Sequence, residues 1–353
     1  MTRIEDIDKN FKIETNIEKE GLKFYDSLQK PFEIYGVYME DGKFRRMPET
    51  VAEKVNQGVL RLHSDCAGGR IRFCTDSPFV AISVEYDRIG DMPHFALSGS
   101  AGFDLYINES EGERYVKTFV PPRNTVNTKK MEALHEFENE RMRAVTINMP
   151  LYSGVTKLYI GLHENASIEK PAPYVNDKPI VYYGSSITQG GCASRPGNCY
   201  QAYISRRFNC DYINLGFSGN AKAEDTMIDY IKNLDMSIFV YDYDHNAPDP
   251  EHLKNTHEKM FKAIRALHPE LPIIIMSSPK WILEGMWQER RDIIEQTYNN
   301  AVSAGDKNVY FLDGKALMAL CGNNGTVDNC HPTDLGFFSM AKAVGDVIEK
   351  IWE

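Results

Sequence analysis

Hydrophobic and polar residues follow two different patterns along the chain, and the change falls near residue 172. Between about residues 60 and 162 the two kinds of residue mostly alternate, as in Val80, Ile82 and Val84. This period of two is typical of strands that bury one face. Many such short runs separated by turns predict an antiparallel β-sandwich, jelly-roll-like, over residues 1–172.

Polar turn segments lie inside two of these alternating runs. Asn108–Gly112 and Ser153–Gly154 each separate two alternating stretches, so each predicts a β-hairpin. The segment Lys129–Arg143 stays open between helix and strand, because Ala133 and His135 also alternate with polar neighbours.

The proline-punctuated segment 169–179 connects the two halves, and residues 173–353 are the second predicted domain. Here apolar strand-like runs alternate with helical stretches, which predicts an α/β domain whose parallel sheet is covered by helices on both faces. Ligands bind at the carboxyl ends of the strands in such sheets. The expected strands are Ile180–Tyr183, Tyr212–Leu215, Ser237–Tyr241, Ile273–Met276 and Val309–Leu312. The expected helices are Tyr200–Phe208, Glu224–Leu234, Pro250–Leu267, Glu289–Ala304 and Phe338–Trp352.

Charge and composition narrow the classes of function. Hydrophobic residues make up 42% of the chain and charged residues 25%, as in soluble globular proteins. The formal net charge of −10, with no basic cluster, argues against nucleic acid as a partner. The first 21 residues are charged throughout and lack the apolar core of a secretory signal. Because no stretch approaches the roughly 20 apolar residues of a membrane span, we expect a cytoplasmic protein without a membrane partner.

Cysteine and histidine spacing predicts neither a disulfide framework nor a metal site. The seven cysteines are an odd number and include no CxxC pair, which favours reduced thiols. His252 and His257 lie five apart on a predicted helix, so we expect them at the surface and not on one ligand-binding face. No cofactor is expected, and nothing in the sequence indicates a homo-oligomer.

Polar clusters follow three of the predicted strands. Ser186 comes just after the first strand among glycines, where a serine can expose its hydroxyl while backbone amides point inward. Gly219 lies in a glycine-containing exit of the second strand, where backbone amides can approach a ligand. After the third strand, the amide of Asn246 could donate to a developing oxyanion. Taken singly, each cluster also fits an ordinary turn or helix cap.

A carboxylate and a histidine lie close together before the last predicted helix. Asp328 precedes His331 by three residues, so it can curl back and hold one imidazole nitrogen. The other nitrogen is then free to accept a proton from Ser186. Serine hydrolases on α/β sheets use this order of serine, acid and histidine.

Together these segments resemble the SGNH, or GDSL-like, hydrolases. The resemblance covers residues 178–353, from a first block at Gly184–Thr188 to a DxxH block at Asp328–His331. It implies a flavodoxin-like sheet of five strands in the order 2-1-3-4-5. It also implies an oxyanion hole formed by the amides of Ser186 and Gly219 and the side chain of Asn246. Upstream, the segment Gly102–Tyr106 resembles the GxDLY signature of a β-sandwich domain that precedes some members.

The third block departs from the family pattern and supplies candidate substrate contacts. Asp244 replaces a frequent glycine and Ala247 a frequent aspartate, while Ser185 replaces a frequent aspartate in the first block. Asp244 and His245 are therefore candidates for contact with substrate. Tyr243 and Trp281 lie near predicted strand ends and could stack on a sugar.

The resulting hypothesis is a serine esterase that removes short acyl groups, acetyl above all. Its expected substrate is an ester of a carbohydrate or another small soluble molecule, processed through an acyl-enzyme on Ser186. An acyltransferase that uses the same acyl-enzyme is the first alternative. A catalytically inactive carbohydrate-binding protein is the second.

Overall fold

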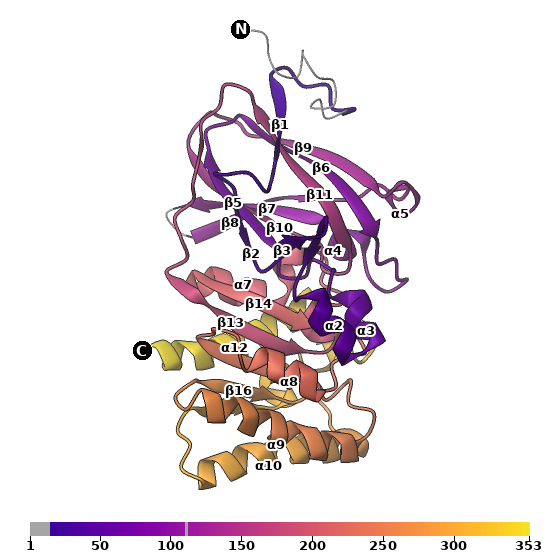
Figure 1. Cartoon of the computed structure of the whole chain (residues 1–353), viewed down its shortest axis with the longest axis vertical. Helices are drawn as coiled ribbons and strands as arrows, with labels where there is room; N and C mark the ends of the chain where they lie inside the picture. The colour runs from indigo at the N-terminus through magenta and orange to yellow at the C-terminus, as the bar shows by residue number, and fades with distance from the viewer. Residues whose placement is uncertain (1–14, 110–111) are drawn as a thin grey trace.

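The chain contains antiparallel sheets and one five-stranded parallel sheet. Figure 1 shows the antiparallel sheets in the upper part of the molecule and the parallel sheet with its helices below them. The computed structural model describes residues 15–109 and 112–353. In the part of the chain that it describes, no helix is long and apolar enough to cross a membrane.

The first half forms a sandwich of two antiparallel sheets. One sheet has the order β1-β11-β6-β9, and the other has the order β12-β5-β10-β7-β8 with β2 paired to β5. Side chains from both sheets, such as Val80 and Ile147, share one buried core. The strands are β1 (Leu22–Asp26), β2 (Glu33–Tyr35), β5 (Arg70–Thr75), β6 (Phe79–Arg88), β7 (Phe103–Glu109), β8 (Gly112–Phe119), β9 (Lys130–Glu136), β10 (Arg143–Asn148), β11 (Gly154–His163) and β12 (Ile168–Glu169).

The structure tests three local predictions that the sequence made in this half. The ambiguous segment after Lys129 is strand β9, which pairs with β6 along seven residues. Strands β7 and β8 pair antiparallel up to Glu109 and Gly112, as predicted for a hairpin, and residues 110–111 lie outside the described residues. The hairpin predicted at Ser153–Gly154 is wrong. Strand β10 pairs with β5 and β7 while β11 pairs with β1 and β6, so this connection crosses between the two sheets.

The second half is the predicted parallel sheet, with strand order β14-β13-β15-β16-β17. This order corresponds to 2-1-3-4-5 and confirms the flavodoxin-like arrangement. The strands are β13 (Asn176–Gly184), β14 (Cys210–Gly216), β15 (Ile238–Asp242), β16 (Ile273–Met276) and β17 (Val309–Leu312). The helices are α6 (Ser186–Gln189), α7 (Tyr200–Phe208), α8 (Asp225–Ile231), α9 (Pro250–Leu267), α10 (Met286–Ser303), α11 (Gly314–Leu317) and α12 (Asp334–Trp352), with 3₁₀ turns η2 (Pro196–Asn198) and η3 (Gly322–Gly325).

Helices cover both faces of this sheet because successive strand residues point to opposite sides. In β15, Phe239 and Tyr241 belong to the core under α8, α9 and α10. Ile238 and Val240 belong to the core under α7 and α12. The strands therefore read as continuous apolar runs, as expected for a sheet buried on both sides.

Segments of the first half also pack into the cores of the second. They include the helices α2 (Glu49–Val55) and α3 (Gln57–Leu62), whereas the hairpin β3 (Tyr38–Glu40) and β4 (Lys43–Arg45) and the short helices α4 (Leu97–Ser100) and α5 (Thr125–Thr128) pack against the core of the sandwich. Ala52 of α2 and Val59 of α3 join the core under α8 and α9. Phe95 and Tyr152 join the core on the other face of the sheet. Figure 1 shows α2 and α3 beside the parallel sheet, next to α8. The division into two domains at residue 172 stays a prediction. Residues from both sides of this boundary pack in the same buried cores.

Candidate active site

Ser186 is the first residue of helix α6, separated from the end of strand β13 by one residue. The Ser185 side chain caps this helix by accepting the amide of Ile187 at 3.1 Å. The amide of Ser186 therefore stays at the open end of the helix, where backbone N–H groups have no intrahelical acceptor. Gly184 makes the sharp exit possible, because a Cβ at this position would clash with Asp242 and Thr188. Ser186 itself is 7% exposed.

Ser186, His331 and Asp328 form a continuous hydrogen-bonded chain. Ser186 Oγ lies 2.9 Å from His331 Nε2, and His331 Nδ1 lies 2.8 Å from Asp328 Oδ2. With Nδ1 donating to the carboxylate, Nε2 is the acceptor that faces the serine hydroxyl. Proton transfer from a serine hydroxyl to a histidine base requires this geometry.

The loop that carries Asp328 and His331 is held in a tight turn. Val327 N donates to His331 O at 2.8 Å, and Asn329 adopts a left-handed conformation with φ 61°. Asparagine tolerates this conformation better than most residues, so the loop can fold the carboxylate back onto the histidine three residues later.

Hydrogen bonds keep Asp328 ionised. Burial acts to raise the pKa of Asp328, but the backbone and side-chain N–H groups of His331 and the backbone N–H of Cys330 lower it to about 2. The amide N–H groups of His331 and Cys330 donate to Asp328 Oδ1 at 2.8 and 3.0 Å. A carboxylate that stays charged can stabilise the imidazolium formed during proton transfer.

The loops after β14 and β15 meet beside α6 and bring the two other predicted oxyanion donors to this edge. Asn246 Oδ1 accepts the amide of Ala221 at 3.2 Å, which leaves the Asn246 NH₂ group as a donor. Gly219 has φ 72° and a Cβ there would meet no atom, so its backbone faces open space. Gln189 of α6 accepts the amide of Ser218 at 2.9 Å and fixes this loop against the helix.

The remaining residues after β15 are mostly structural. Tyr243 is 1% exposed, because its ring packs in the core against His257 and its hydroxyl lies 2.8 Å from Thr256 Oγ1. This corrects the expectation that Tyr243 contacts substrate. Asp244 is 2% exposed and accepts both the amide and the hydroxyl of Ser278, at 2.9 and 2.6 Å. It holds the loop after β16 and is not available to a substrate.

His245 lies next to the loop that carries Asp328 and His331, here called the catalytic loop. Its Nδ1 is 3.6 Å from Cys330 Sγ, and its ring centre is 4.7 Å from that of Trp287. Burial lowers the pKa of His245 to about 4, although Asp244 acts to raise it, so the imidazole is neutral near neutral pH. Contact between His245 and substrate stays a prediction.

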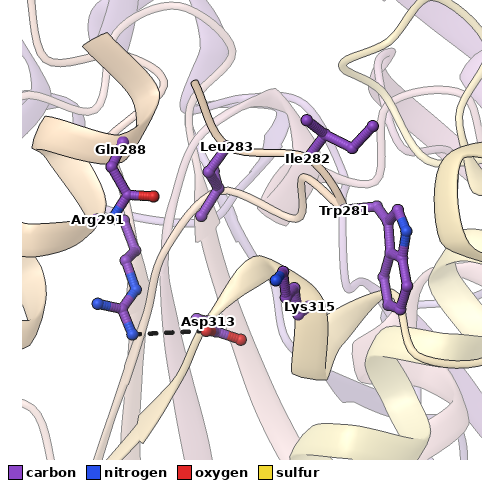
Figure 2. A pocket seen from close by; sticks show the side chains of 7 residues that line it. All are labelled: Trp281, Ile282, Leu283, Gln288, Arg291, Asp313 and Lys315. Atoms are coloured by element: carbon purple, nitrogen blue, oxygen red, sulfur yellow. Dashed lines mark ion pairs between the residues drawn. The ribbon is translucent and has the colours of Figure 1, made fainter. Parts of the chain in front are cut away.

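Trp281 borders a cavity of about 480 Å³ at the same edge of the sheet. Figure 2 shows its indole beside this cavity, with Asp313 and Lys315 facing it from the segment after β17. Trp281 is 38% exposed. The neighbouring Lys280 Nζ donates to Asn329 O at 2.6 Å, so the loop that carries Trp281 contacts the catalytic loop.

Neither histidine of helix α9 is the free surface residue that the spacing suggested. His257 is 1% exposed, stacks on Tyr241 with ring centres 4.7 Å apart, and lies 2.8 Å from Thr297 Oγ1. Burial lowers its pKa to about 3. His252 Nε2 lies 2.8 Å from Lys222 O. Helix α9 packs between α8 and α10, so both side chains find partners there.

Sequence reasoning missed three residues that lie around Ser186 and His331. The ring of His94 lies 5.4 Å from the ring of His331 between centres, and Tyr152 donates to Ser186 O at 3.0 Å. Cys192 lies in the turn after α6, within 4.8 Å of ligand atoms of both histidines. No local signal marks His94 and Tyr152, because only the packing of the sandwich against the parallel sheet brings them to Ser186 and His331.

Two protein families match the chain, one in each half. Residues 177–349 match the GDSL-like lipase/acylhydrolase family, and residues 22–168 match the N-terminus of SGNH-hydrolase-type esterases, the GxDLY domain. The chain belongs to the GDSL-like hydrolase family. Among curated proteins, none matches this chain in sequence.

Several solved structures share the fold of this chain over nearly its whole length. A protein described as a GDSL-like lipase from Bacteroides ovatus has 26% identity and a TM-score of 0.82, over 94% of this chain and 98% of its own. A salicylyl-acyltransferase from a tetracycline biosynthetic pathway has 18% identity and a TM-score of 0.76, over 95% and 98%. An acetyl xylan esterase from Butyrivibrio proteoclasticus has 12% identity and a TM-score of 0.59, over 94% and 98%. The last two share the fold with this hydrolase.

Proposed function

We propose that this hydrolase is a serine esterase that removes short acyl groups, acetyl above all, from a carbohydrate or a similar small polar molecule. The observation that carries the proposal is the chain from Ser186 Oγ through His331 to Asp328, with hydrogen bonds of 2.9 and 2.8 Å. This arrangement is the one that nucleophilic acyl transfer requires.

Acylation begins when Ser186 Oγ attacks the ester carbonyl and His331 Nε2 accepts the hydroxyl proton. The tetrahedral oxyanion accepts hydrogen bonds from the amides of Ser186 and Gly219 and from the side chain of Asn246. His331 then returns the proton to the departing alcohol, which leaves the acyl group on Ser186. Water attacks this acyl-enzyme with His331 again as the base, and the carboxylic acid is released.

Polar and aromatic groups beside the site favour a sugar as the alcohol part of the ester. Trp281 offers an exposed ring for stacking, and Asp313 and Lys315 line the same cavity. The structural relative from Butyrivibrio proteoclasticus is an acetyl xylan esterase, which supports the same class of substrate.

Hydrolysis of p-nitrophenyl esters with acyl chains of increasing length tests the proposal. We expect activity on acetate to exceed activity on longer esters, and Ser186→Ala to lower turnover by at least about a thousandfold. Ser303→Ala, an exposed serine at the end of α10, is the matched control and should retain full activity. Equal activity in wild type and Ser186→Ala would contradict the assignment.

Release of acetate from acetylated xylo- and cello-oligosaccharides tests the substrate class. We expect release by the wild type and much slower release by Trp281→Ala, whereas p-nitrophenyl acetate turnover should stay near wild type in that variant. Equal loss on both substrates would contradict a sugar-binding role for Trp281.

Transfer of the acyl group to an alcohol is the second candidate, because the same acyl-enzyme can react with an acceptor other than water. A salicylyl-acyltransferase has the same fold over 95% of this chain. Added sugar alcohols distinguish the two reactions by the product formed. A new ester in excess of free acid would favour the acyltransferase, and free acid alone would favour the esterase.

A further inference from the structure

A histidine and a cysteine approach the catalytic His331 from two other segments of the chain. His94 belongs to the loop after β6 of the sandwich, and Cys192 belongs to the turn after α6. The ligand atoms of His94, Cys192 and His331 all lie within 4.8 Å of one another. None of these contacts is needed for the proposed acyl transfer.

We propose that His94, Cys192 and His331 form a binding site for Zn²⁺, and that zinc bound there inhibits the esterase. Two imidazoles and one thiolate are the donor set that zinc prefers, and three protein ligands leave a fourth position open to water. The inhibitory part of this inference rests on the proposed role of His331 as the base.

The separation of the three donors suits a zinc ion after a small closure. Zinc–nitrogen and zinc–sulfur bonds of about 2.0–2.3 Å place the ligands of a tetrahedral site roughly 3.3–3.6 Å apart. The three atoms already lie within 4.8 Å, and His94 is exposed, so its side chain can move toward the other two.

The backbone holds Cys192 close to the histidine ring. A Cβ at the preceding residue, Gly191, would lie 3.3 Å from His331 Cδ2, so this turn passes directly beside the imidazole. Gly191 N donates to Ser186 O at 2.8 Å, which fixes the turn against α6. Cys192 has φ 75°, a left-handed conformation that is uncommon for a residue with a Cβ.

Zinc binding exchanges a proton for the metal. Cys192 binds zinc as a thiolate. A zinc–sulfur bond forms as the S–H bond breaks, and one proton leaves to the solvent. The two histidines bind as neutral imidazoles.

Zinc would inhibit the esterase because it binds the nitrogen lone pair with which His331 accepts the serine proton. A neutral imidazole has one acceptor nitrogen, and in His331 this is Nε2, which lies 2.9 Å from Ser186 Oγ. A metal bound to Nε2 occupies the electron pair that would accept the serine proton. The serine then has no base, and acylation stops.

A second group of ligands near His331 fits zinc less well. Asp328, Cys330 and His331 also have ligand atoms within 4.8 Å of one another. The carboxylate of Asp328, however, already accepts His331 Nδ1 and two backbone amides, so a metal there would have to displace these hydrogen bonds. Cys330 therefore provides a matched control for Cys192.

Direct binding tests the site without any assay of activity. Reduced, metal-free protein competes with a chromophoric chelator for Zn²⁺, and Co²⁺ serves as a spectroscopic probe of the same ligands. We expect one zinc per chain, affinity at least about tenfold weaker in His94→Gln and Cys192→Ser, and near wild-type affinity in Cys330→Ser. We also expect a thiolate-to-cobalt charge-transfer band that Cys192→Ser abolishes. Unchanged affinity or an unchanged band in Cys192→Ser would overturn the inference.

Hydrolysis of p-nitrophenyl acetate under zinc titration tests the inhibition. We expect zinc to inhibit the wild type at the concentrations at which it binds, a chelator to restore activity, and Cys192→Ser to need at least about tenfold more zinc. Saturable binding through Cys192 without loss of activity would overturn the inhibitory part. Zinc binding by a protein that is inactive even without zinc would instead contradict the proposed esterase function.

Discussion

In the proposed mechanism, Asn246 is the side chain that stabilises the oxyanion. Its side-chain oxygen accepts the amide N–H of Ala221 at 3.2 Å. This hydrogen bond fixes the orientation of the side-chain NH₂ group before the reaction begins. A preorganised donor of this kind stabilises the transition state more than the ground state.

Replacement of Asn246 by alanine should therefore lower kcat by about 10²–10³-fold with a much smaller change in KM. Steady-state kinetics on p-nitrophenyl acetate measures both constants. Asn255→Ala, an exposed asparagine on α9, should leave both unchanged. A kcat within about twofold of wild type for Asn246→Ala would remove Asn246 from the oxyanion hole.

Single residues were predictable where the chemistry lies in short local motifs. Ser186, Asp328 and His331 each stand at a strand end or in a DxxH spacing, and the structure brings these three together. Tyr243 was misjudged because it follows a strand end, yet α9 still covers it there. His94 carries no local signal, since it reaches His331 only through the packing of two sheets.

At the scale of elements, the exit of β15 carries a buried acid that holds α6 in place. Asp242 is 3% exposed and hydrogen-bonds to Thr188 in α6. Burial raises the pKa of Asp242 to about 8, although the hydrogen bond from Thr188 acts in the opposite direction. The neutral acid is therefore the form that the folded protein favours.

Stability should fall as the pH rises from about 4 to about 8, because the folded protein retains a proton at Asp242 that the unfolded chain has lost. The contribution of this one group approaches about 1.4 kcal/mol per pH unit within the window. Asp242→Asn should remove this slope, so its free energy of unfolding should rise relative to wild type as the pH increases.

Urea denaturation at pH 5 and pH 8 measures the effect. Asp235→Asn, which alters an exposed carboxylate, should follow the pH dependence of the wild type. Parallel curves for wild type and Asp242→Asn would show that Asp242 is ionised in the folded state.

Elements were predictable where local signals were strong. Helix α9 begins and ends as expected, with Asp249 accepting the amide of His252 at 2.7 Å as its N-cap and Pro250 in the first turn. The short helices α2 and α3 were not anticipated. Their stability comes from burial against the second half of the chain, which no local pattern of the first half reveals.

At the scale of the molecule, Arg46 links the two halves of the chain. This arginine follows β4 and is 3% exposed. Its guanidinium donates to the carbonyl oxygens of Leu62, Asn214 and Gly216, at 2.7, 3.0 and 2.6 Å, and lies 4.8 Å from the ring centre of Phe217. The last three residues belong to β14 and to the loop that leads to Gly219.

Loss of this guanidinium should leave buried carbonyl groups without donors. We expect Arg46→Ala to lower the free energy of unfolding by at least about 2 kcal/mol and to reduce activity. Arg141→Ala removes an exposed ion pair with Glu109 and should cost less than about 1 kcal/mol. Equal stability of the two variants in urea would show that the halves are not coupled through Arg46.

The kind of sheet in each half was predictable from the change in hydrophobic periodicity. A period of two predicts antiparallel strands with one buried face, and continuous apolar runs predict a parallel sheet that is buried on both faces. The shared cores were not, since nothing in the sequence shows that Ala52 or Phe95 is buried against residues more than a hundred positions away. The consequence for function is that the sandwich contributes His94 and Tyr152 to the surroundings of Ser186.

Covalent labelling tests the central claim, that Ser186 is a nucleophile activated by His331, most directly. The protein is treated with a serine-directed phosphonate, and the modified residue is identified by intact mass and peptide mapping. We predict one label per chain, located on Ser186, absent from Ser186→Ala and formed at least about a hundredfold more slowly in His331→Gln. A label on any other residue, or equal labelling of Ser186→Ala, would contradict the account.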